Sequence, residues 1–125
     1  MILNIPPCSK PRMTQRDRWK KRQCVLDFYA FRDPIKQEVK RINTLLIKES
    51  PLDWDNLTVI FLVPMPKSWS KKKKALMVGK PMQQRPDLDN YIKGLFDATH
   101  EEDSSIWKVT ASKIWTDCTG KIIIN

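Results

Sequence analysis

Two aspartates separated by a single residue, Asp87 and Asp89, stand at the entrance of a predicted helix and are the sharpest chemical signal in the sequence. Carboxylates this close together resist ionising at the same time unless a cation lies between them. Mg²⁺ and Mn²⁺ prefer such oxygen ligands and keep several of their waters. The pair is therefore a candidate metal site. The alternative is structural, because aspartate often caps helix N-termini and interacts favourably with the helix dipole there.

Lys93 follows Asp89 by four residues, which places both side chains on the same face of a helix. In a catalytic role, Lys93 would stabilise charge on a phosphate oxygen or orient an attacking water. In a structural role, it would form an ordinary ion pair with Asp89. Asp97 lies on the same face but about 12 Å further along the axis, which argues against a direct catalytic role.

Asp103 is the third candidate ligand, and its position sets a geometric condition. A helix over residues 88–99 carries the chain roughly 16 Å away from Asp87. The next four residues can return about that distance if they are extended. Asp103 therefore rejoins the pair only if the turn doubles back or the helix ends early; otherwise the site must draw on a partner subunit.

The distribution of charge supports a metal-dependent nuclease. The chain has 125 residues and a net charge of +9, yet residues 87–103 hold six acids and one base. Two basic segments, residues 10–22 and 67–80, precede this acidic stretch. Basic residues would hold a nucleic-acid backbone while carboxylates hold a metal, although chance clustering of acids at helix ends is the alternative. The DNA-binding candidates are Lys10, Arg12, Arg16, Lys67, Lys71, Lys72, Lys73 and Lys74.

Several classes of protein are disfavoured by composition. No apolar run approaches the ~18–20 residues of a membrane span, and no basic leader with an apolar stretch opens the chain, so we expect a cytoplasmic protein. Cys8, Cys24 and Cys118 are widely spaced without a C-x-x-C motif, and His100 is the single histidine. This pattern argues against a zinc site or a disulfide scaffold. We expect the cysteines to be free thiols that act as small buried hydrophobes.

The chain is expected to form one α+β domain over residues 1–125, with a small mixed or antiparallel sheet and two main helices packed on it. Asp33 and Pro34 suit the start of the first helix, whereas the conformation of residues 25–32 is left open. Trp69 could stack on a base or pack locally, and packing is the more common outcome. The last two strands are expected to pair as an antiparallel hairpin. The expected elements are a strand at 1–5, a basic arm at 6–22, a helix at about 34–48, a strand at 57–63, a long exposed basic loop at 65–86, a helix at 88–99, an acidic turn at 100–105, a strand at 107–115, a turn at 117–120 and an edge strand at 121–124.

The segment Arg-Pro-Asp-Leu-Asp-Asn-Tyr-Ile-Lys-Gly-Leu-Phe-Asp-Ala (85–98), followed by Glu-Asp-Ser-Ser-Ile (102–106), resembles the RusA family of Holliday junction resolvases of bacteria and their phages. Met-Pro-Lys-Ser-Trp-Ser-Lys-Lys-Lys-Lys (65–74) is similar to the lysine-rich loop of phage members. The segment around Lys10-Pro11-Arg12 resembles their N-terminal basic segment. The resemblance thus covers nearly the whole chain in the expected order, and its central motif is the specific part.

This resemblance implies a homodimeric nuclease that nicks two strands symmetrically across a four-way DNA junction, using Mg²⁺ or Mn²⁺ and no small-molecule cofactor. Such an enzyme would act in recombination and repair in the cytosol of a bacterium or of a phage-infected host, with no membrane partner. By position, Asp87, Asp89 and Asp103 match the family's essential aspartates, and Lys93 matches its motif lysine. Glu102 departs from the pattern, because the family often has aspartate there.

Three other functions fit parts of the sequence. A nuclease for another branched or flapped DNA would use the same chemistry, since branch preference depends on dimer geometry. A non-catalytic nucleic-acid-binding module would make the acidic segment structural. A basic adaptor for another protein would leave the alternation of lysine block, Asp-x-Asp pair and acidic turn unexplained.

Overall fold

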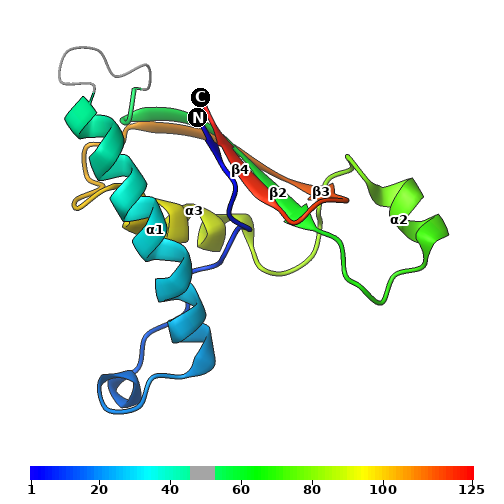
Figure 1. The fold of residues 1–125 in the computed structure, drawn as a ribbon, viewed down its shortest axis with the longest axis horizontal. Helices are drawn as coiled ribbons and strands as arrows, with labels where there is room; N and C mark the ends of the chain where they lie inside the picture. Colours follow the sequence, from blue (N-terminus) through cyan, green and yellow to red (C-terminus); the bar gives the residue numbers. More distant parts are fainter. Residues whose placement is uncertain (46–52) are drawn as a thin grey trace.

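The computed structural model describes residues 1–45 and 53–125 (Figure 1). Strand β1 opens the chain, and a short 3₁₀ turn follows within the basic arm. The elements are β1 (Ile2–Leu3), η1 (Gln15–Arg18), α1 (Gln23–Leu45), β2 (Asn56–Pro64), α2 (Lys71–Met77), α3 (Leu88–Thr99), β3 (Lys108–Thr116) and β4 (Lys121–Ile124). The predicted bounds of the helix at 88–99 are confirmed.

The sheet is mixed, with the strand order β1-β4-β2-β3, and the expected α+β fold is confirmed. Strands β2 and β3 run parallel in a register that begins at Asn56 opposite Lys108. Strand β4 is antiparallel to both β2 and β1. Since α3 lies in the chain between β2 and β3, it forms the crossover that a parallel pair requires.

The predicted hairpin between the last two strands is wrong. Strand β4 skips its sequence neighbour β3 and inserts between β2 and β1, so it is also not an edge strand. The chain passes over the end of β2 at Gly120, whose backbone has a φ of +97°. A Cβ at this position would meet the Pro64 ring at 3.1 Å and the Leu62 carbonyl at 3.2 Å. Burial drives this arrangement, because Ile122 and Ile124 become completely buried in the interior of the sheet.

Helix α1 starts eleven residues before the predicted start at Pro34, which lies inside the helix. The expected cap at Asp33 is therefore wrong, and the undecided residues 25–32 are helical. The reason is a buried stripe at helical spacing that includes Val25, Phe28 and Ile35, all completely buried. Its burial outweighs the hydrogen bond lost at Pro34. The predicted end at residues 46–48 lies outside the described residues.

The segment 65–86, expected to be a long loop, contains helix α2. The Ser70 side chain accepts a hydrogen bond from the Lys73 amide at 3.2 Å, which caps the helix. Trp69 packs locally, with its ring 4.9 Å from the ring of Trp115. Lys73 lies 4.2 Å from the centre of the Trp69 ring. The cap and this anchor offset the mutual repulsion of the lysines, so the four consecutive lysines occupy a helix rather than a loop.

The cysteines are free, as expected, but their predicted burial is wrong for two of them. Cys24 and Cys118 are exposed, whereas Cys8 is half-buried. Cys24 lies on the solvent side of α1, and Cys118 lies in the turn that crosses the end of β2, so neither position faces the core.

The core lies between the sheet and the helices α1 and α3. Alternate residues of β2, including Val59 and Phe61, are buried on the face toward the helices. The Phe61 ring stacks on Tyr91 of α3 with centroids 5.4 Å apart. Helix α2 lies apart from this core, at the opposite end of the molecule from α1 (Figure 1). Helix α3 is thus fixed from both sides, by the sheet and by α1.

Gly94 allows the N-terminal segment to cross α3 at close range. The Lys10 amide donates a hydrogen bond to the Asn90 carbonyl of α3 at 3.3 Å. A Cβ at Gly94 would lie 2.7 Å from the Cys8 carbonyl oxygen and 3.3 Å from the Lys10 amide nitrogen. Both neighbours are backbone atoms, so a larger residue would displace the segment.

We predict that Gly94→Ala lowers the free energy of unfolding by about 1–3 kcal/mol, the usual cost of overpacking. The sign of this change is informative, because alanine at an unobstructed helix position would instead raise the free energy of unfolding by roughly 0.5–1 kcal/mol. Chemical denaturation of both proteins measures the difference. A more stable variant would show that the segment does not press on α3.

Candidate active site

Asp87 and Asp89 are presented to solvent at the start of α3. Asp87 occupies the N-cap position in an extended conformation, but its side chain makes no capping hydrogen bond. Asp89 is 67% exposed and lies 3.6 Å from Lys93 Nζ, one helical turn further on. The capping alternative therefore does not explain Asp87, whose carboxylate is not used to satisfy the helix terminus.

Lys113 of β3 holds the backbone that leads into this pair. Its Nζ donates hydrogen bonds to the Gln84 carbonyl at 2.6 Å and to the Pro86 carbonyl at 2.8 Å. The two carbonyls lie just before Asp87, so the strand fixes the point at which α3 begins. Lys113 was not among the residues predicted from the sequence. The available signal is a lysine in the middle of a strand, between half-buried neighbours.

The acidic segment after α3, residues 100–105, is bonded to the residues that precede β2. The His100 ring lies between Thr99 Oγ1, 2.7 Å from Nδ1, and the Trp54 carbonyl oxygen, 3.0 Å from Nε2. The Ser105 hydroxyl donates to Asp55 Oδ1 at 2.7 Å. Asp103 lies between these two attachments and is exposed. The position of Asp103 is therefore set by contacts on both sides of it.

An open hollow of about 380 Å³ lies beside α3 and brings several predicted site residues together. Its lining includes Lys93 and Asp103, so the chain does turn back toward α3 after the helix ends. The remaining lining residues are Lys10, Phe96, Asp97, His100 and Glu101. Asp97 is engaged there by Lys10, whose Nζ lies 3.3 Å from its carboxylate.

The three candidate ligands do not converge on one point. Within residues 1–45 and 53–125, no three histidine, cysteine, aspartate or glutamate side chains lie close enough together to hold one metal ion. Asp87 and Asp89 lie at the start of α3, whereas Asp103 lines the hollow further along the helix. Lys93 connects the two places, because it pairs with Asp89 and also lines the hollow. The donor set itself consists of exposed carboxylates, which suit a hard divalent cation.

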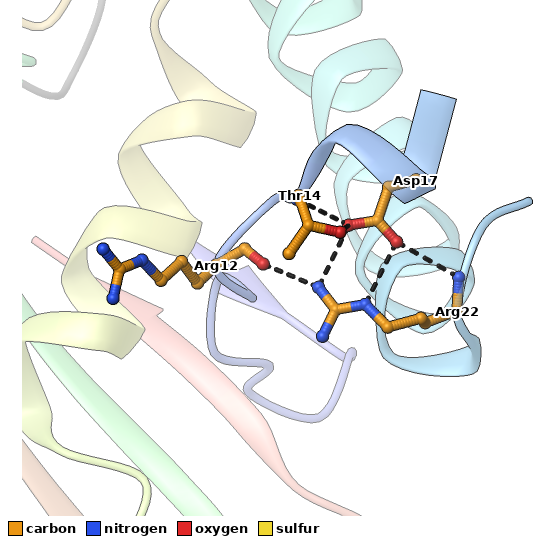
Figure 2. Close-up of polar contacts among 4 residues, drawn as sticks. All are labelled: Arg12, Thr14, Asp17 and Arg22. Atoms are coloured by element: carbon orange, nitrogen blue, oxygen red, sulfur yellow. Dashed lines mark hydrogen bonds and ion pairs between the residues drawn. The ribbon is translucent and has the colours of Figure 1, made fainter. Parts of the chain in front are cut away.

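The basic arm is organised around an ion pair between the buried Asp17 carboxylate and the exposed Arg22, which was not among the features predicted from the sequence (Figure 2). Arg22 donates from Nε and Nη2 to the two carboxylate oxygens of Asp17, each at 3.0 Å. The Thr14 amide donates to the same carboxylate at 2.8 Å, and Arg22 also reaches the Arg12 carbonyl at 2.6 Å. Asp17, the single acid among the arm's basic residues, was the available signal. The network closes the arm into a compact turn around η1.

The predicted DNA-binding residues fall into two groups. Lys10, Arg12 and Arg16 lie on the arm beside α3 and η1, and the second group lies on and just before α2. In this second group Lys74 is half-buried, whereas the others are exposed: Lys67, Lys71, Lys72 and Lys73. The arm and α2 lie at different ends of the molecule (Figure 1). A nucleic acid that contacts both groups must therefore extend across the protein.

Residues 5–125 match the family described as endodeoxyribonuclease RusA. The chain therefore belongs to the RusA family of endodeoxyribonucleases, and it is a nuclease of this α+β fold. No curated protein and no solved structure matches the chain. No helix in the part of the chain that the structure describes is long and apolar enough to cross a membrane.

The Asp17 network gives a pH-dependent prediction for the arm. The hydrogen bonds from Arg22, and then from the Thr14 amide, hold the pKa of Asp17 well below its usual range. A lowered pKa means that the network's stabilisation is complete above the unfolded value of about 3.9 and is lost as the pH falls through the folded value. We predict that hydrogen exchange at the Thr14 amide stays slow from pH 7 to 5 and loses its protection at lower pH.

The Asp17→Asn variant should lose this protection already at neutral pH, because asparagine cannot form the ion pair. Exchange measured by NMR tests this, with Asp33→Asn as a control, since Asp33 pairs with Arg32 on the exposed side of α1. Equal protection in wild type and Asp17→Asn would mean that the ion pair does not order the arm.

Proposed function

We propose that this nuclease cuts four-way DNA junctions in a reaction that depends on Mg²⁺ or Mn²⁺. The observation that supports the proposal most strongly is the pair Asp87 and Asp89, two exposed carboxylates at the start of α3. Asp87 makes no capping hydrogen bond, and Lys113 holds the backbone that precedes it. The chain has a net charge of +9 and belongs to a family of endodeoxyribonucleases, so we infer that the substrate of this site is a phosphodiester.

Asp87, Asp89 and Asp103 would hold the divalent cation through oxygen ligands. When bound, such an ion activates a water for attack and neutralises charge on the phosphate and the leaving oxygen. Lys93, now paired with Asp89, stabilises the negative charge that develops on a phosphate oxygen. Asp103 joins the pair through a rearrangement of the acidic segment or through a partner subunit, because the single chain keeps it apart from the other two.

The preference for a four-way junction rests on symmetry and on the separation of the basic groups. A homodimer presents two equivalent sites related by a two-fold axis, which matches the two-fold symmetry of a junction and gives paired nicks. The arm and α2 bind the backbones of the DNA arms, reading shape more than sequence. The protein would act in DNA recombination or repair in the cytosol of a bacterium or of a phage-infected cell.

Cleavage of a synthetic junction tests the proposal. The purified protein is incubated with a four-way junction or a linear duplex of the same sequence, in Mg²⁺ or in EDTA. We expect paired symmetric nicks in the junction alone, in Mg²⁺ alone. Binding without cleavage in Mg²⁺ and Mn²⁺ would leave a DNA-binding module, and equal cleavage of both DNAs would refute junction specificity.

We predict that Asp89→Asn lowers the single-turnover rate of junction cleavage by at least about a hundredfold, because a metal ligand contributes several kcal/mol to the transition state. Junction binding should be kept or tightened, since a charge that repels phosphate is removed. Gel-shift and cleavage assays on the same preparation separate the two effects. Asp117→Asn, an exposed aspartate in the turn before β4, is the matched control. Loss of binding by a folded Asp89→Asn protein would contradict the assignment.

We also predict that replacing Lys71–Lys74 with alanine weakens junction binding and flattens its dependence on salt. Each phosphate contact contributes about 0.9 to the slope of log K against log salt, so the slope should fall by about 1 to 4. Alanine maintains helix α2, because it is the best helix former. Fluorescence anisotropy at several salt concentrations measures the slope. An unchanged slope would show that α2 points away from the DNA.

A further inference from the structure

Trp19 is exposed to an unusual degree. Its side chain is 88% exposed, more than that of any other large hydrophobic residue in the described parts of the chain. By contrast, Trp115 is buried and Trp69 packs against it. An exposed tryptophan ring lacks the stabilisation that burial gives. A partner that covers the ring would therefore be bound more tightly.

The backbone that carries Trp19 is held in place. The amides of Trp19 and Lys20 both donate to the Arg16 carbonyl, at 3.0 and 2.9 Å. Asp17 and Arg22 flank the tryptophan in the sequence, and the network between them, drawn in Figure 2, closes the turn. The ring is therefore presented from a fixed position, and little backbone entropy remains to be lost when it meets a partner.

The surroundings of the ring are entirely cationic at the surface. A shallow pocket of about 360 Å³ is lined by Trp19 and by four basic residues: Arg16, Lys20, Lys21 and Arg22. The nearby acid, Asp17, is only 6% exposed and is neutralised by Arg22. The volume of this pocket lies within the range of about 300–1,000 Å³ that is usual for ligand pockets in proteins. The site thus combines a flat apolar surface with positive charge, which suits a planar group attached to an anion.

We propose that Trp19 stacks on a nucleobase at the branch point of the DNA while Arg16, Lys20 and Lys21 around it bind the adjoining phosphates. The branched substrate rests on the proposed function above. Stacking needs an unstacked base face, which is costly to expose in a continuous duplex and cheaper where strands diverge. Trp19 thereby contributes to the discrimination between branched and linear DNA, which the charges alone do not provide.

Binding in EDTA tests this role independently of cleavage. We expect Trp19→Ala to weaken binding to a four-way junction about 5- to 100-fold, while binding to a linear duplex changes less than twofold. Trp19→Phe should recover most of the affinity, because phenylalanine also stacks. Trp107→Ala is the matched control, since this tryptophan is 71% exposed but lies next to the acidic segment. A junction with 2-aminopurine beside the branch reports stacking directly, through a fluorescence change with wild type that Trp19→Ala abolishes.

An equal loss of affinity for junction and duplex, or no loss for either, would overturn the proposal. So would unchanged junction binding by Trp19→Ala together with lost binding to anionic vesicles, which would assign the ring to a membrane surface. The outcomes separate this inference from the proposed function. A wild type that binds junctions through Trp19 but cuts nothing contradicts the function alone, whereas cleavage by wild type with unaltered Trp19→Ala binding contradicts the inference alone.

Discussion

The close crossing of the N-terminal segment over α3 at Gly94 is the contact on which the arrangement of charge depends. It brings Cys8 and Lys10 against the helix that carries the carboxylates, and it places the Lys10 ammonium beside Asp97. A basic arm and an acidic helix thus lie next to each other although residues 23–87 separate them in the sequence. Without glycine at this position, the arm would be displaced from the helix, and the cations would no longer flank the aspartates.

Rigidity and exposure are divided between different parts of α3. Its buried side, with Tyr91 and Leu95, is packed into the core, whereas Asp87 and Asp89 point into solvent. Lys113 fixes the backbone before the helix, so the carboxylates are mobile only in their side chains. The backbone of such a preorganised site stays in position when a metal ion replaces Lys93 as the partner of Asp89.

The local elements could be predicted where periodicity was strong, as in the helix from Leu88 to Thr99 and the strand around Phe61. The start of α1 could not be predicted. Pro34 favours a helix start at its own position, whereas packing against residues remote in the sequence favours a helix that begins earlier. The position of β4 depends on the crossing at Gly120, which involves residues remote in the sequence. The aspartates could be proposed as ligands from their type and spacing, and the structure shows Asp87 and Asp89 exposed at the start of α3. Lys113 and the Asp17–Arg22 pair could not, since their roles depend on folding of the chain.

The central claim is that the start of α3 holds a divalent cation, and direct binding of Mn²⁺ tests it without DNA or catalysis. Free Mn²⁺ is measured by electron paramagnetic resonance during titration of wild type, Asp87→Asn, Asp89→Asn and the control Asp117→Asn. We predict that wild type and the control bind Mn²⁺ and that Asp87→Asn and Asp89→Asn do not. Equal Mn²⁺ binding by all four proteins would contradict it.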